Sequence, residues 1–332
     1  MSEQLINYEI EHNDKQKSIR GNHSIIKRAF LVDINYRGSE FELHGCINDV
    51  LAVKAMLIDH YGYLEENILL LSDDTIVKPT AANIINGWKW LISKRSISHF
   101  NPGREAQSQA YLPLTSSDNA NLYFHYSGHG SQVRDTNGDE IDGKDETICP
   151  IDFLTAGMIS DDIMRVKLAN KVPANNKLVA VIDACHSESS FDLLWTVKSN
   201  MILGKRNKVS SIGEGFPSLG KLSLTKTGKY LPTEGEVIML SGCRDNETSA
   251  DVQIEGKGQG ALTYSLVKIL ENSKYDITYN ELLTKVRSFI KTNHLSTQIP
   301  CLSFGKWPIS TFKGQDNVSP VKFTNSSLKF TL

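Results

Sequence analysis

Short apolar runs alternate with segments of helical spacing along most of the chain. Strands are predicted where the runs are rich in β-branched and aromatic residues, over 27–35, 66–72, 121–126, 178–182, 235–241 and 299–304. Helices are predicted where apolar residues recur every three or four positions, over 46–61, 80–93, 261–272 and 279–292. Strands that alternate with helices predict an α/β fold, with a mostly parallel sheet and helices on both of its faces.

Three segments depart from this alternation. Residues 1–25 are polar and aperiodic, which predicts a short flexible N-terminal arm. Residues 196–230 are rich in Lys, Ser and Gly, so we expect an exposed connector between two parts of a single domain, 26–195 and 231–332. Pro300 lies in the last predicted strand, which we expect to be irregular or at an edge, because proline cannot donate to a ladder.

Composition and charge narrow the possible classes of protein. The 332 residues are 40% hydrophobic and 22% charged, and the formal net charge of -2 gives no reason to expect a nucleic-acid partner. No apolar run approaches the roughly 18 residues of a membrane helix, and the first residues lack the features of a secretory signal. The five cysteines are widely spaced without a C-x-x-C pair, so we expect no disulfide framework, and a reducing, cytoplasmic setting.

Two of the predicted strands end in residues that can carry chemistry. The strand 121–126 is followed by Ser-Gly-His-Gly, which contains His129, and the strand 178–182 by Asp-Ala-Cys-His-Ser, which contains Cys185. The carboxyl ends of parallel strands share one edge of the sheet, so the two side chains can meet there. A cysteine thiolate with a nearby base is a nucleophile.

The alternative interpretation of Cys185 is a small buried apolar residue, which isolated cysteines usually are. We favour a nucleophile because Cys185 follows a strand, because its neighbours are polar, and because glycines flank His129 and let a substrate approach the backbone. His186 is a competing base, but we expect its side chain to point away from that of Cys185, which precedes it directly.

Both motifs resemble the catalytic motifs of the caspase-like cysteine peptidases and are most similar to those of the metacaspases. Further motifs agree in order, at residues 43–49, 139–146, 149–152, 159–162 and 240–251. The resemblance extends over residues 27–308, nearly the whole chain. It implies a caspase-like three-layer sandwich, formed by one peptidase domain over 26–332 with a large-subunit-like and a small-subunit-like part. It also implies a short form of the family without a long prodomain.

The resemblance implies thiolate attack on a peptide carbonyl. His129 would act as general acid and base and would protonate the leaving amine. The backbone N–H groups of Gly130 and Cys185 would form the oxyanion hole. No third member of a triad is evident in the sequence, and the resemblance requires none.

Substrate specificity is implied by two carboxylates. Asp49 and Asp183 match the positions at which metacaspases hold an Arg or Lys side chain, with Cys46 and Ser127 beside them. The alternative is that Asp49 is a charge at a helix start and Asp183 a loop carboxylate. We favour the pocket, because an acid two residues before the nucleophile is unfavourable unless it has a function. Asp245 is a weaker candidate for the same cleft.

Calcium is the cofactor that the resemblance implies. The positions that match the family's carboxylate ligands are Asp145, Asp161, Asp162 and Asp192. Carboxylate oxygens suit this hard cation, whereas the alternative is a solvated acidic surface with charges at a helix start. An EF-hand is excluded, although residues 135–146 carry acids at several of its positions, because Glu140 stands where its loop needs glycine.

The main hypothesis is thus a calcium-dependent cysteine endopeptidase that cleaves after Arg or Lys. One rival is a caspase-like peptidase with another specificity or activator. Another is a non-catalytic scaffold of the same fold, which the presence of both Cys185 and His129 disfavours. No ligand spacing supports a zinc hydrolase. We expect a monomer with protein or peptide substrates, and cleavage of the chain by itself between Lys205 and Lys229.

Overall fold

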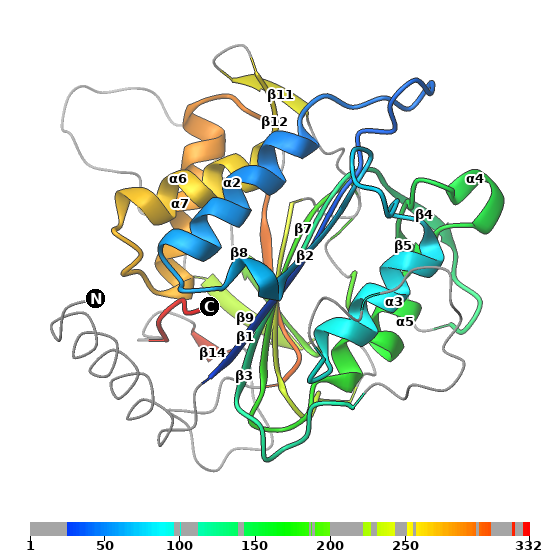
Figure 1. Ribbon diagram of the computed structural model, residues 1–332. Helices are drawn as coiled ribbons and strands as arrows, with labels where there is room; N and C mark the ends of the chain where they lie inside the picture. The colour runs from blue at the N-terminus through cyan, green and yellow to red at the C-terminus, as the bar shows by residue number, and fades with distance from the viewer. Residues whose placement is uncertain are drawn as a thin grey trace, which may run out of the picture.

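A large twisted sheet crosses the centre of the molecule, with helices on both sides (Figure 1). The computed structural model describes residues 25–95, 100, 112–138, 143–185, 187, 190–199, 222–226, 231–242, 251–254, 257–296, 299–306, 321–322 and 328–332. Within them the sheet has nine strands in the order β14-β9-β8-β13-β10-β7-β3-β1-β2. The strands are β1 (Ile26–Asp33), β2 (Ile68–Ser72), β3 (Ala120–Ser127), β7 (Lys177–Asp183), β8 (Trp195–Ser199), β9 (Leu222–Lys226), β10 (Glu236–Ser241), β13 (Cys301–Phe304) and β14 (Val321–Lys322).

One side of the sheet is parallel. It consists of β10, β7, β3, β1 and β2, and each of these strands runs parallel to the next one in this order. The pairs from β10 through β13, β8 and β9 to β14 are antiparallel. The parallel block places the carboxyl ends of β1, β3 and β7 in one line, where Asp33 pairs with Ser127 and Ser127 pairs with Asp183. This line is the sheet edge at which an open α/β fold holds its site.

Alternate residues of the central strands pack on opposite helical layers. Ala29 and Leu31 of β1 belong to the core under α2 (Cys46–Asp59), α6 (Ala261–Asn272) and α7 (Tyr279–Thr292). Phe30 and Val32 belong to the core under α3 (Ala81–Leu91) and α5 (Asp161–Lys167). Figure 1 shows these two groups of helices on opposite sides of the sheet. Because helices cover both faces of the sheet, the central strands have mostly continuous apolar sequences.

Capping side chains explain where two helices begin. The Thr80 side chain accepts a hydrogen bond from the N–H of Asn83 at the start of α3. Thr278 and Glu281 form a reciprocal capping box at the start of α7. The smaller elements are η2 (Glu65–Asn67), β4 (Gly130–Arg134), β5 (Lys144–Ile148), α4 (Phe153–Ala156), β6 (Ile159–Ser160), η4 (Ala169–Lys171), β11 (Asp251–Ile254) and β12 (Lys257–Gly260).

The sequence predicted the main elements well. Each predicted helix and strand is present, with its ends displaced by two residues at most. The predicted α/β sandwich with helices on both faces is confirmed. No helix in the described ranges is long and apolar enough to cross a membrane.

Two expectations about strands are wrong. The expected connector 196–230 contains strands at both ends, β8 and β9, and Thr196 and Val197 are buried in the sheet. The partner strand β13 comes about a hundred residues later, so the local polar composition hides this pairing. The strand near Pro300 is also not an edge, because β13 lies between β10 and β8. Pro300 directly precedes its first residue, so no ladder bond is lost.

Other predictions fall on residues outside the described ranges. These are the arm over 1–24, most of the connector at 200–221 and 227–230, and the residues Asp139, Glu140, His186 and Asp245.

Gly87 provides a test of the packing between α3 and the sheet. A Cβ atom at Gly87 would lie 2.2 Å from Cζ of the fully buried Phe30. Glycine to alanine normally stabilises a helix by about 1 kcal/mol. We expect Gly87→Ala instead to lower the free energy of unfolding by about 1–3 kcal/mol through overpacking, as measured by urea denaturation. The exposed Lys89→Ala in the same helix is the control. A gain in stability for Gly87→Ala would contradict this packing.

Candidate active site

His129 and Cys185 follow the neighbouring strands β3 and β7. The N–H of Gly128 donates to the carbonyl of Asp183 at 3.3 Å, which continues the strand pairing to the site. A Cβ atom at Gly130 would lie 2.0 Å from the carbonyl oxygen of Cys185, so only glycine permits this approach. The structure therefore brings together the two motifs predicted to carry the chemistry. The thiol of Cys185 is partly exposed and forms no disulfide.

The imidazole of His129 is oriented by a backbone carbonyl. Its Nε2 lies 2.8 Å from the carbonyl oxygen of Phe41. A carbonyl oxygen only accepts, so Nε2 carries the proton and Nδ1 keeps the lone pair. The sequence analysis found no third residue beside Cys185 and His129. It missed Phe41 because the main-chain carbonyl makes the contact, and a main-chain contact does not depend on residue type.

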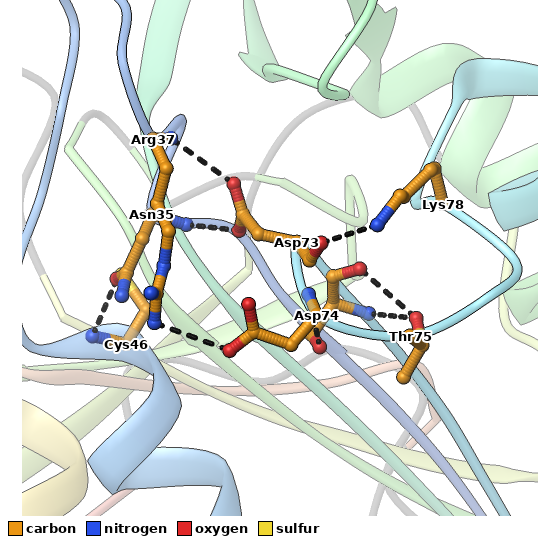
Figure 2. A network of polar contacts seen from close by, with 8 residues as sticks. Asn35, Arg37, Cys46, Asp73, Asp74, Thr75 and Lys78 are labelled. Carbon is orange, nitrogen blue, oxygen red and sulfur yellow. Dashed lines mark hydrogen bonds and ion pairs between the residues drawn. The ribbon is translucent and has the colours of Figure 1, made fainter.

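Phe41 lies in the loop between β1 and α2, and this loop is hydrogen-bonded to the turn after β2 (Figure 2). The carboxylate of Asp73 accepts the N–H of Asn35 at 2.6 Å and the N–H of Arg37 at 3.2 Å. The side chain of Asn35 in turn accepts the N–H of Cys46, the first residue of α2, at 3.2 Å. The loop between β1 and α2 is thereby held at both ends.

Asp49 and Asp183, the predicted substrate-binding acids, lie together in the interior. A Cβ atom at Gly260 would be 2.6 Å from Oδ2 of Asp49 and 2.3 Å from Oδ2 of Asp183. Ser127 donates to Asp49 at 3.1 Å, and Cys46 lies one turn before Asp49 on α2. Burial, and next the charge of Asp183, raise the pKa of Asp49 well above its usual value. The structure thus brings these four residues close together.

Residues at the start of α6 donate hydrogen bonds to both acids. The N–H of Gly260 donates to Asp49 at 2.8 Å, and the N–H and hydroxyl of Thr263 each donate to Asp183 at 2.8 Å. A helix start favours anions, so these contacts also fit the alternative of a structural role. A substrate cation would have to share or displace these donors.

Asp33 is a buried carboxylate that the sequence analysis missed. Its exposure is 0%, and neither carboxylate oxygen accepts a hydrogen bond from the described residues. Burial, followed by the charges of Asp73 and Asp74, raises the pKa of Asp33 to about 8. Its charge also contributes to the raised pKa of Asp49. The signal in the sequence is a charged residue directly after the apolar run 29–32.

Two of the predicted calcium ligands, Asp161 and Asp192, lie close together. Burial and the charge of Asp192 raise the pKa of Asp161 to about 10, so these two acids are close neighbours. Asp162 begins α5 beside Asp161 and accepts a hydrogen bond from Asn137 at 2.7 Å. Asp145 is buried in β5. Among the described residues, no three His, Cys, Asp or Glu side chains are arranged to hold a metal ion.

Two further buried groups flank the site. His125 is fully buried within β3, and burial lowers its pKa to about 3. Its Nε2 lies 3.1 Å from the hydroxyl of Thr263. Burial, and then the neighbouring Cys185, raise the pKa of Cys149 to about 12, so its thiol stays protonated. Neither group is therefore available as a base or nucleophile at neutral pH.

Asp33 makes the stability of the protein depend on pH. Its folded pKa of about 8 lies above the value near 4 of an unfolded chain, so between these pH values the folded state holds a proton that the unfolded state has lost. This contribution favours folding at low pH and is lost as the pH rises toward 8. We expect Asp33→Asn to gain stability relative to wild type between pH 5 and pH 8, by at most about 1.4 kcal/mol per pH unit.

Urea denaturation at several pH values measures this difference. The exposed Asp59→Asn is the matched control and should track the wild type at every pH. An Asp33→Asn profile parallel to that of wild type would show that Asp33 is charged throughout.

Known proteins resemble this chain in sequence and in fold. The family model described as "Caspase domain" matches residues 26–306. Metacaspase-1 of Eremothecium gossypii is 36% identical over 310 residues, which are 83% of this chain and 63% of that protein. Metacaspase-1 of Schizosaccharomyces pombe is 32% identical over 310 residues, which are 83% of this chain and 67% of that protein.

A crystal structure of protein GSU0716 from Geobacter sulfurreducens shares the fold, with a TM-score of 0.52 and 20% identity over 85% of this chain and 94% of that one. The chain spans 63% and 67% of the length of the two metacaspases that it matches. Together with the ordered motifs and the parallel sheet edge that carries His129 and Cys185, the sequence matches show that this chain belongs to the caspase domain family and, within it, to the metacaspases.

Proposed function

We propose that the protein is a cysteine endopeptidase with Cys185 as nucleophile and His129 as general acid and base. The observation that carries the proposal is the bond from His129 Nε2 to the carbonyl of Phe41, which makes Nδ1 the ring nitrogen that can exchange a proton with a substrate or with Cys185. The close contact of Gly130 with the Cys185 backbone supports the same site.

In this mechanism the thiol proton of Cys185 moves to Nδ1 of His129. The thiolate attacks the peptide carbonyl, and the N–H groups of Gly130 and Cys185 bind the developing oxyanion. His129 then donates its proton to the leaving amine, and water hydrolyses the thioester with His129 as base. The bond to Phe41 stabilises the imidazolium that forms in the first step, because a doubly protonated ring still donates from Nε2.

We further propose that the acid pair selects Arg or Lys before the scissile bond. Asp49 and Asp183 are 2% and 3% exposed, and two buried acids are most stable when a cation neutralises them. An acidic substrate side chain would be repelled. Gly260 and Thr263 donate hydrogen bonds to these acids, so the junction of β12 and α6 must move when a basic side chain binds to them.

Calcium is proposed as the activating ion, held by Asp161 and Asp192 with Asp145 and Asp162 joining when it is bound. The support is the raised pKa of Asp161 beside Asp192, which marks a pair of buried acids suited to a hard cation. Asp192 also has a left-handed backbone with φ 46°, an uncommon conformation for a non-glycine residue that is frequent at functional sites. When bound, the ion would neutralise these acids.

The first test compares two fluorogenic peptides, one ending in Arg and one in Asp, with millimolar calcium and with chelator. We expect cleavage after Arg only, in calcium only, and none by Cys185→Ala, because thiolate, acid pair and ion are all required. Asp183→Asn should raise KM for the Arg peptide by tenfold or more, which is about 1.4 kcal/mol of lost charge pairing.

Each part of the proposal can fail separately. Cleavage after Asp would overturn the role of Asp49 and Asp183, and cleavage in chelator would overturn the role of calcium. Calorimetry on Cys185→Ala measures calcium binding in the absence of activity. Adding Asp192→Asn should weaken the calcium affinity, whereas adding the exposed Asp276→Asn should not. No cleavage of either peptide by wild type would favour the scaffold hypothesis.

We also propose that the enzyme cleaves its own chain between Lys205 and Lys229, in the basic stretch that begins after β8 and includes β9. Because β8 and β9 both belong to the main sheet, the two fragments should stay associated after cleavage. Mass spectrometry of purified wild type in calcium should show new C-termini at Lys or Arg in this stretch, and Cys185→Ala should stay intact. An intact wild-type chain under conditions in which a peptide is cut would contradict self-processing. The monomeric state and the cytoplasmic setting stay predictions from the sequence.

A further inference from the structure

Tyr36 lies directly against His129 in an unusual backbone conformation. It has φ 51°, in the left-handed region that is unfavourable for a residue with a side chain. Its side chain is 3% exposed, and its ring centroid is 4.8 Å from that of His129. Such a backbone outlier beside a candidate active site suggests a functional constraint.

The hydroxyl of Tyr36 joins the two backbone segments that meet at the site. It accepts the N–H of His129 at 3.1 Å and donates to the carbonyl of Cys149 at 2.5 Å. The hydroxyl of Tyr126 donates to the carbonyl of His129 at 2.8 Å, on the other side of the same residue. Burial raises the pKa of Tyr36 well above its usual value, so its hydroxyl keeps the proton that it donates.

Asp73 stabilises the strained turn on which Tyr36 sits. Its two carboxylate oxygens accept the N–H groups of Asn35 and Arg37, the residues on either side of Tyr36 (Figure 2). Left-handed residues flanked by such N–H groups form a concavity that binds an anion, here supplied by the protein itself. Lys78 also donates to the carbonyl of Asp73 and fixes the turn after β2. The carboxylate thus offsets the unfavourable conformation of Tyr36.

We infer that Tyr36 is a positioning residue for His129, and that Asp73 acts through Tyr36. The ring supports one face of the imidazole while the hydroxyl fixes the backbone of His129, so Nδ1 keeps the direction in which it meets the thiol of Cys185. Phe41, on the same loop, fixes the other ring nitrogen. The loop between β1 and α2 thereby determines the orientation of the base through three contacts. This inference rests on the proposed peptidase function.

The test uses Tyr36→Phe, which keeps the ring and removes the hydroxyl. We expect kcat for the Arg peptide to fall about tenfold with KM changed less than twofold, because a small misplacement of a catalytic group slows the chemical step without weakening binding. The rate at which iodoacetamide alkylates Cys185 at pH 6.5, followed by mass spectrometry of the modified peptide, should fall in parallel. Tyr63→Phe is the matched control, since its buried hydroxyl contacts only a backbone carbonyl of β3, at 3.3 Å.

A second pair of variants tests the turn without altering an aromatic ring. Asp73→Ala should lower kcat and the alkylation rate as Tyr36→Phe does, whereas Asp74→Ala, which removes only the exposed ion pair with Arg37, should change neither. The inference would be overturned if kcat and the alkylation rate of both Tyr36→Phe and Asp73→Ala stayed within twofold of wild type, or if only KM changed. Alkylation needs no substrate, so a wild type that cleaves no peptide would refute the proposed function while the alkylation rates still decide the role of Tyr36.

Discussion

Parallel pairing of β3 with β7 is the constraint on which the candidate site depends. Its register places Ser127 beside Asp183, and the next residues of each strand carry His129 and Cys185. A shift by one residue would turn every side chain of a strand to the other face and would change the position of His129 relative to Cys185. The burial of Val179 and Val181 under one helical layer, and of Ala180 and Ile182 under the other, therefore determines where the chemistry can occur.

A second theme is the concentration of buried acids behind that edge. Asp33, Asp49 and Asp183 lie on one face of the sheet edge or on the helix above it, and each is almost inaccessible. Buried carboxylates are costly unless they are paired or hydrogen-bonded. Asp49 and Asp183 use the start of α6, whereas Asp33 has no hydrogen-bond donor among the described residues and holds a proton at neutral pH.

The loop between β1 and α2 contributes more than the motifs suggest. It supplies a carbonyl from Phe41 and a ring and hydroxyl from Tyr36, both directed at His129. The loop is fixed by a carboxylate from the turn after the neighbouring strand β2, which belongs to a different part of the chain. Orientation of the imidazole is thus a property of the packed sheet edge and cannot be assigned to the histidine motif alone.

The sequence by itself determined the elements, the layers and the two chemical motifs, because these depend on local periodicity and on residue type. It placed α6 and α7 at their observed ends and indicated that His129 and Cys185 follow neighbouring strands. Only the tertiary structure decided that β8 and β9 join the sheet, since their partners are distant in the chain. It also decided the partner of His129, which is a main-chain carbonyl, and the burial of Asp33, because backbone contacts and desolvation arise only when distant segments pack together.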